Sequence, residues 1–115
     1  MSNINIFITA DDIQASSVRV ETFNDRCAEI LQHRGKESQL RQLAEECTEL
    51  AKESLKAIRG DSDNRDAITE EMADVEIMIK QIKIALDIKP EEICKVMSEK
   101  LSRERARIKA EIGED

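Results

Sequence analysis

Residues that break helices are few and widely separated in this sequence. Its 115 residues include three glycines and one proline, too few for a chain of many turns. Between them, apolar side chains recur at intervals of three and four residues, which is the spacing of one face of an α-helix. The core must be aliphatic, because the chain has two Phe, no Trp and no Tyr, and this composition suits packed helices better than a β-sandwich. The sequence predicts a single all-α domain over residues 1–115.

The helix breakers and capping patterns divide the chain into four predicted helices. Thr9 and Asp12 resemble a capping pair at the start of the first helix, in which a break is allowed near Ser16-Ser17. Gly35 is typical of a position just after a helix, residues 59–64 are the clearest loop, and Pro90 is typical of a helix start. The predicted helices cover residues 10–32, 36–58, 65–86 and 90–108, between an N-terminal arm at 1–9 and a C-terminal tail at 109–115.

The apolar faces of the two central helices differ in width. The stripe of the second helix comprises Leu40, Leu43, Cys47, Leu50, Ala51 and Ile58. The third helix has a broader face, with Ile77 and Ile84 on a further side. One chain offers too little surface to cover a helix that is apolar on more than one side, so we expect a partner subunit.

Charge, hydropathy and cysteine content exclude several classes of function. The formal net charge is −7, whereas nonspecific binding to nucleic acid needs a basic surface. A membrane-spanning helix needs an apolar run of about 18 residues, and no run in the sequence approaches this length. The N-terminus lacks the basic region of a secretory signal. Three cysteines without a Cys-x-x-Cys pair predict reduced, mostly buried thiols in a cytoplasmic protein. We expect neither a nucleic-acid partner nor a membrane.

Two acidic clusters in the second and third predicted helices repeat one pattern. Each reads acid, acid, two uncharged residues, acid and a branched aliphatic residue, as EECTEL at 45–50 and EEMADV at 70–75. Glu46 and Glu49 lie along the margin of an apolar stripe, while Glu71 and Asp74 lie within and at the edge of one. Residues three apart on a helix are neighbours, so the two carboxylates of each pair lie side by side. Burying an ionised carboxylate is costly without a partner, so this placement calls for a cation.

The chemistry of these acids indicates which cation. Oxygen ligands alone select hard ions, meaning Mg²⁺ with Mn²⁺ as a substitute, and protein-bound Mg²⁺ commonly bridges substrate phosphates. Glu45 or Glu53 is a candidate base beside such a site. An acidic pair in a chain with 25 acidic residues is often a solvated face, but its repetition favours metal binding. A di-iron site is disfavoured, because it uses Glu-x-x-His pairs and the single histidine, His33, lies outside both clusters.

The sequence Glu45-Glu46-x-x-Glu49 followed by Glu71-x-x-Asp74 resembles the EExxE…ExxD signature of the MazG-like all-α nucleoside triphosphate pyrophosphohydrolases. Relatives in this superfamily are dimeric dUTPases, dCTP pyrophosphatases and phosphoribosyl-ATP pyrophosphohydrolases. The resemblance covers residues 20–108. It implies a four-helix bundle completed by a partner subunit, as a homodimer or a dimer-of-dimers tetramer. It also implies Mg²⁺-dependent hydrolysis of a nucleoside triphosphate to the monophosphate and pyrophosphate, for house-cleaning or control of nucleotide pools.

The same resemblance assigns roles to individual residues. Glu46, Glu49, Glu71 and Asp74 would be the Mg²⁺ ligands, and Glu45, Glu46 and Glu49 would carry the catalysis. Substrate-binding candidates are Gln39, Glu53, His33, Lys100, Arg103 and Arg105. The last three correspond loosely to late basic residues that touch phosphates in the family, although a cationic helix end that pairs with Glu99 and Glu104 explains them equally well. The Trp side chains that stack on the base in dCTP-cleaving relatives are missing, so the preferred base stays open.

A second interpretation belongs to a different class. The chain would be a non-catalytic helical interaction or regulatory protein that keeps the fold. It predicts that Glu49→Ala and Glu71→Ala leave function intact and that Mg²⁺ does not raise the melting temperature.

Overall fold

The computed structural model describes residues 21–60 and 63–113, and within these ranges the chain is helical and has no strand. Four helices follow one another: α2 (Phe23–Arg34), α3 (Lys36–Arg59), α4 (Arg65–Ala85) and α5 (Pro90–Glu111). The predicted all-α fold is confirmed. The predicted arm at 1–9 and the helix start near residue 10 lie outside the described residues. No described helix is long and apolar enough to cross a membrane.

The start of α2 differs from the prediction. Residues 21 and 22 are not helical. The prediction of a helix from near residue 10 to residue 32 allowed a break near Ser16-Ser17 but none at this point, and in this respect it is wrong. The Asp25 N–H donates to Thr22 Oγ1 at 3.0 Å, and the Thr22 N–H donates to Asp25 Oδ2 at 3.2 Å. This capping box satisfies two backbone donors and begins the helix at Phe23. Thr9 and Asp12 have the same spacing as Thr22 and Asp25, which is why the sequence alone did not distinguish the two starts.

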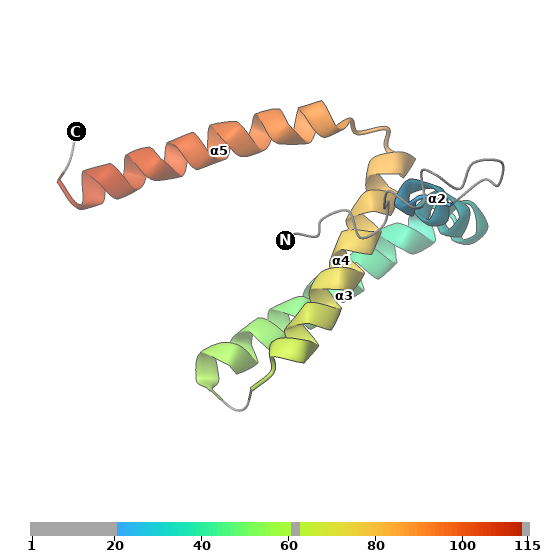
Figure 1. The fold of residues 1–115 in the computed structure, drawn as a ribbon, viewed down its shortest axis with the longest axis horizontal. Coiled ribbons are helices and arrows are strands. Elements are labelled where there is room, and N and C mark those ends of the chain that lie inside the picture. Colours follow the sequence, from blue (N-terminus) through green and yellow to red (C-terminus); the bar gives the residue numbers. More distant parts are fainter. Residues whose placement is uncertain (1–20, 61–62, 114–115) are drawn as a thin grey trace.

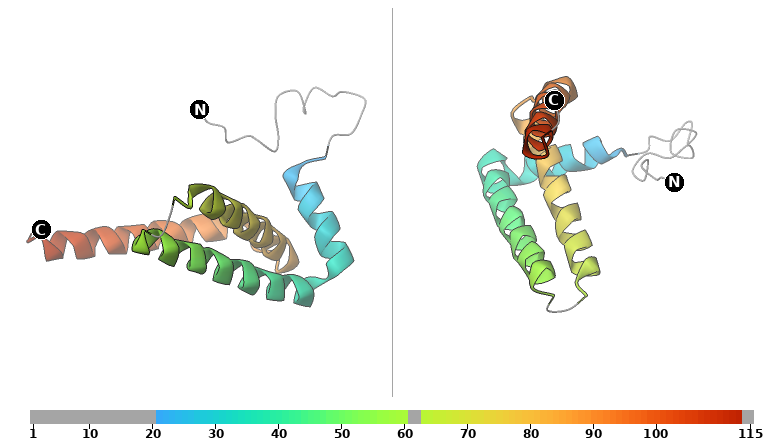
Figure 2. Two further views of the ribbon diagram at one scale, coloured as in Figure 1. Left: turned by 90° about the horizontal axis from the view of Figure 1, so that it is seen from below. Right: turned by 90° about the vertical axis from the view of Figure 1, so that its left-hand side faces the viewer.

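α3 and α4 form an antiparallel hairpin, and α2 packs across its open end (Figures 1 and 2). The hairpin turns where the sequence predicts a loop. Gly60 has φ 70° and its N–H donates to Lys56 O at 3.1 Å and Ala57 O at 3.2 Å, which ends α3. Asn64 then caps α4. The hairpin brings residues early in α3 next to residues late in α4.

The buried apolar core is small and centred on α4. Its members are Cys27 of α2 and Val75, Met78 and Ile82 of α4. Cys27 Sγ lies 3.9 Å from the backbone oxygen of Ile77, so α2 covers part of the second apolar side of α4. This burial raises the pKa of the Cys27 thiol.

The predicted apolar stripe of α3 is only partly covered in the isolated chain, and the prediction of mostly buried cysteines is wrong. Much of the predicted stripe of α3 is solvent-exposed, including Leu40 at 40% and Ile58 at 80%, because only one side of α3 meets α4 within the described chain. The cysteines are not mostly buried, since Cys47 and Cys94 are exposed. The exposed stripe, including Cys47, leaves apolar surface open on the outside of the hairpin.

α5 leaves the other helices and contacts none of them within the described residues (Figures 1 and 2). Asp87, with φ 54°, turns the chain after α4, and the Ile88 N–H donates to Lys83 O at 2.9 Å. α5 starts at Pro90 as predicted and extends to Glu111, into the segment predicted as a tail. The Cα radius of gyration is consequently 18.2 Å, against about 13 Å for a compact domain of about 100 residues.

Candidate metal centre

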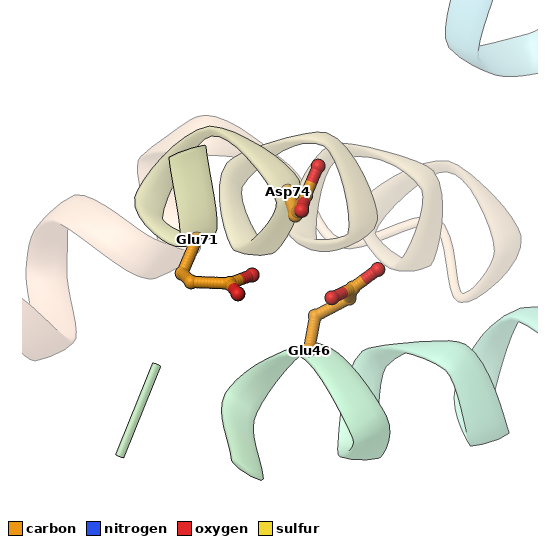
Figure 3. Close-up of side chains that lie close together, drawn as sticks. All are labelled: Glu46, Glu71 and Asp74. Atoms are coloured by element: carbon orange, nitrogen blue, oxygen red, sulfur yellow. The ribbon is translucent and has the colours of Figure 1, made fainter. Parts of the chain in front are cut away.

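Three of the four predicted metal ligands converge between α3 and α4. Glu46 points from α3 toward Glu71 and Asp74 on α4 (Figure 3). One carboxylate oxygen of each residue lies within 4.8 Å of the others, and all three residues are half-buried. The three side chains converge because the antiparallel packing of the hairpin places the middle of α3 beside the first half of α4.

The electrostatics of the cluster disfavour its charged form. Partial burial raises the pKa of Glu71, and the negative charges of Asp74, Glu46 and Glu49 raise it further. Partial desolvation and repulsion between like charges both destabilise the ionised cluster. A bound divalent cation would relieve both effects, because it supplies positive charge where the carboxylates converge.

Gln42 orients one of the three carboxylates, and sequence reasoning missed it. Its Nε2 donates to Glu46 Oε2 at 2.9 Å from one turn earlier in α3. Such a contact holds a ligand in one rotamer and leaves its other oxygen available. The spacing of four residues between Gln42 and Glu46 was a readable signal for this contact.

The other acids of the first cluster stand further from the centre. The Glu49 side chain is 46% exposed and lies 3.7 Å from Lys52 Nζ. It is not one of the three converging acids, although its charge contributes to the raised pKa of Glu71. Glu45, the candidate base, is exposed on α3. The structure therefore places Glu46 in the centre, Glu49 beside it and Glu45 on the open surface.

Glu53 is held by Asn64 at the loop end of the hairpin. Asn64 Nδ2 donates to the backbone oxygen of Glu53 at 2.8 Å and to its Oε1 at 3.2 Å, while Lys56 Nζ donates to Oε2 at 3.3 Å. The hydrogen bond from Asn64, followed by the contact with Lys56, lowers the pKa of Glu53 despite its burial. A lowered pKa makes the carboxylate a weaker base, so these contacts favour a structural role over proton abstraction.

Gln39 lies at the opposite end of the hairpin. Its Nε2 donates to Gln81 Oε1 at 2.8 Å, and the exposed fractions of the two residues are 6% and 1%. The predicted substrate-binding amide thus has a buried partner within the chain. Sequence reasoning missed Gln81, although a glutamine among the apolar residues late in α4 was a visible irregularity. His33 is exposed at the end of α2.

The cationic candidates do not reach the carboxylates of their own chain. Lys100, Arg103 and Arg105 are exposed on α5, which contacts no other described helix. On the same helix, Arg107 pairs with Glu104 at 2.9 Å. Within one chain, the structure brings together three of the four predicted metal ligands but not the predicted phosphate contacts.

Comparisons of the chain with protein-family models, with curated proteins and with solved structures gave no match. The resemblance to MazG-like enzymes therefore rests on the sequence motif alone.

Proposed function

We propose that this protein is a Mg²⁺-dependent nucleotide pyrophosphohydrolase. The observation that carries the proposal is the convergence of Glu46, Glu71 and Asp74 across two helices within 4.8 Å. The EExxE…ExxD motif supplies the substrate class. Water is added across the bond between the α- and β-phosphates, which yields a nucleoside monophosphate and pyrophosphate.

The donor set of the cluster fits Mg²⁺. Every ligand is a carboxylate oxygen, and neither a histidine nor a cysteine belongs to the group of three, which favours a hard cation. Glu46, Glu71 and Asp74 would hold the ion, and Glu49, whose charge acts on Glu71, would join them or face a phosphate-bound ion. When bound, Mg²⁺ would neutralise the substrate's phosphates beside the carboxylates. Gln42 would keep the Glu46 carboxylate in its orientation.

We further propose that the active form is a homodimer or a dimer of dimers. α5 has no helix contact within its described chain, yet Val96, Met97 and Leu101 are 47%, 49% and 66% exposed on it. Apolar surface also remains open on α3 and α4, at Ile58, Met72 and Ile79. Assembly of two chains would bury these surfaces and could supply Lys100, Arg103 or Arg105 to a neighbouring site.

The test is release of pyrophosphate from a panel of canonical and modified nucleoside triphosphates, with phosphoribosyl-ATP included. Turnover should require Mg²⁺ or Mn²⁺ and should vanish in Glu71→Gln. The neighbouring exposed acid gives a matched control, because Glu70→Gln removes the same charge from the outer side of α4 and should retain turnover. Loss of activity in both variants, or in neither, would contradict the assignment of the site.

The competing interpretation, a non-catalytic interaction protein, is favoured by the apolar surface of α5. It predicts no pyrophosphate from any substrate in the panel and no change of melting temperature on addition of Mg²⁺. Both results together would contradict the enzymatic proposal and support the interaction protein in its place.

A further inference from the structure

The contact line between α3 and α4 carries polar side chains at a regular interval. On α3, Gln39, Glu46 and Glu53 are seven residues apart. The same interval separates Asn64, the N-cap of α4, from Glu71, and Asp74 from Gln81. Seven residues are about two helical turns, so these side chains recur on one side of each helix. Because the helices are antiparallel, the residues meet in three successive levels.

Hydrogen bonds between side chains join the two helices at the outer two levels, whereas three carboxylates meet at the middle level. At one end, Gln39 Nε2 donates to Gln81 Oε1 at 2.8 Å in the interior. At the other end, Asn64 Nδ2 donates to both the side chain and the backbone oxygen of Glu53. The acidic cluster lies midway between these two polar pairs, where Glu46 of α3 faces Glu71 and Asp74 of α4 (Figure 3).

We infer that the Gln39–Gln81 and Glu53–Asn64 pairs are positioning residues of the metal site, an inference that rests on the proposed function. Three like charges between two helices push the helices apart and favour any shift that separates the carboxylates. A pair of helices that meets mainly through aliphatic side chains can relieve this repulsion by sliding or rotating. Two polar pairs, one two turns before the cluster and one two turns after it, oppose both movements.

The chemistry of the pairs suits this role better than a contribution to stability alone. A hydrogen bond between two buried amides forms in one register only, since any slip leaves a buried donor or acceptor without a partner. Apolar side chains of similar volume would pack in several registers. The polar pairs thus hold the three carboxylates at a separation suited to a cation before the cation binds. The free energy of cation binding is then not reduced by the cost of aligning the helices.

The experiment measures Mn²⁺ affinity of the full-length protein by electron paramagnetic resonance, at a temperature where circular dichroism shows every variant folded. Gln39→Leu/Gln81→Leu replaces one polar pair by an apolar pair, and Asn64→Ala removes the other. Each should weaken Mn²⁺ binding by about 10- to 100-fold, the usual effect of losing residues that orient metal ligands. The double leucine variant should melt no lower than the wild type, since exchanging both partners for apolar groups is close to neutral.

Two further variants separate positioning from general destabilisation. Glu53→Gln keeps an oxygen acceptor for Asn64 and should retain wild-type affinity, whereas Glu53→Leu should not. Thr22→Ala weakens the cap of α2, far from the cluster along the chain, and should lower the melting temperature without changing Mn²⁺ affinity. Wild-type affinity in folded Asn64→Ala and in the double leucine variant would overturn the inference alone. Absence of Mn²⁺ binding to the wild type would overturn the proposed metal site and this inference together.

Discussion

Among the described residues, Glu71 carries a charge that opposes the fold. Its pKa is raised by partial burial and by Asp74, Glu46 and Glu49, so the folded, metal-free chain is penalised at any pH where Glu71 is ionised. The penalty is fully present above the raised pKa, shrinks as the pH falls below it and Glu71 takes up a proton, and is gone below the pKa of the unfolded chain. Glu71→Gln should therefore raise the melting temperature of the metal-free protein at neutral pH, and the gain should shrink on acidification.

Thermal unfolding in the presence of a chelator, repeated across the acidic pH range, measures this effect. Glu70→Gln, on the exposed side of α4, is the control and should change the melting temperature little. Mg²⁺ should raise the melting temperature of the wild type but not of Glu71→Gln. A lower melting temperature for metal-free Glu71→Gln at neutral pH would show that the charge is compensated within the chain.

Glu53 has the opposite pH dependence. Its pKa is lowered by the hydrogen bond from Asn64 and by Lys56, so its contribution to stability is present above the pKa of the unfolded chain. That contribution is lost as the pH falls through the lowered pKa of the folded protein. Denaturant titrations should show Glu53→Gln less stable than the wild type near neutral pH, with the difference vanishing in acid. A difference that persists unchanged in acid would assign the effect to packing and not to charge.

Thr22 tests the local rule that starts α2. Its side chain accepts the Asp25 N–H at 3.0 Å, and removing such a cap costs about 1 kcal/mol. Thr22→Ala should lower the free energy of unfolding by that amount, as measured in denaturant, and leave pyrophosphate release intact. Thr22→Ser, which keeps the hydroxyl, should recover most of the loss.

At the scale of the helices, local signals predicted most boundaries. Gly35, Gly60 and Pro90 mark helix ends where the chain has no competing signal, and α3, α4 and the start of α5 follow the prediction closely. The start of α2 was missed because two capping patterns of equal strength precede it. The direction of α5 was not readable, since it depends on Asp87 adopting φ 54°, a conformation that the residue type permits but does not require.

The candidate site was predictable along each helix but not between helices. Spacing within α3 and α4 identified all three acids of the cluster, because the helical repeat alone determines which residues share a side. The partners Gln81, Asn64 and Gln42 were missed. For Gln81 and Asn64 the reason is that the register of one helix against another is set by tertiary packing, and a single sequence carries no direct record of it.

The contact between α3 and α4 gives a prediction about stability at this scale. Gln81→Leu alone leaves the buried amide of Gln39 without its partner, which should cost about 1–3 kcal/mol. Adding Gln39→Leu should recover most of this loss. The free energies of unfolding of the two single variants and the double variant form a cycle that measures the coupling. Losses that simply add would show that the two amides are not energetically paired.

At the scale of the whole molecule, the exposed apolar surface of α5 predicts self-association. Leu101 is 66% exposed in the single chain, so Leu101→Asp would be nearly neutral for a monomer. In a dimer that buries it, the change should cost about 1.5–3 kcal/mol for each leucine removed from the interface. Sedimentation velocity should show a shift toward the monomer, while Ser98→Asp, also exposed on α5, should leave the mass unchanged. A monomeric wild type at all concentrations would contradict the proposed assembly.

The isolation of α5 has a consequence for the lifetime of the protein. A lone helix of this length is marginal in water, because most helical stability in proteins comes from packing, and α5 has no helix packed against it within the described chain. In the proposed dimer, a second molecule would supply the packing that orders α5. Dilution below the dissociation constant would unwind a segment that carries Lys100, Arg103 and Arg105 and open it to proteases that cleave after basic residues. The abundance of the protein and the integrity of α5 would then rise and fall together, so that chains present at low concentration are degraded first.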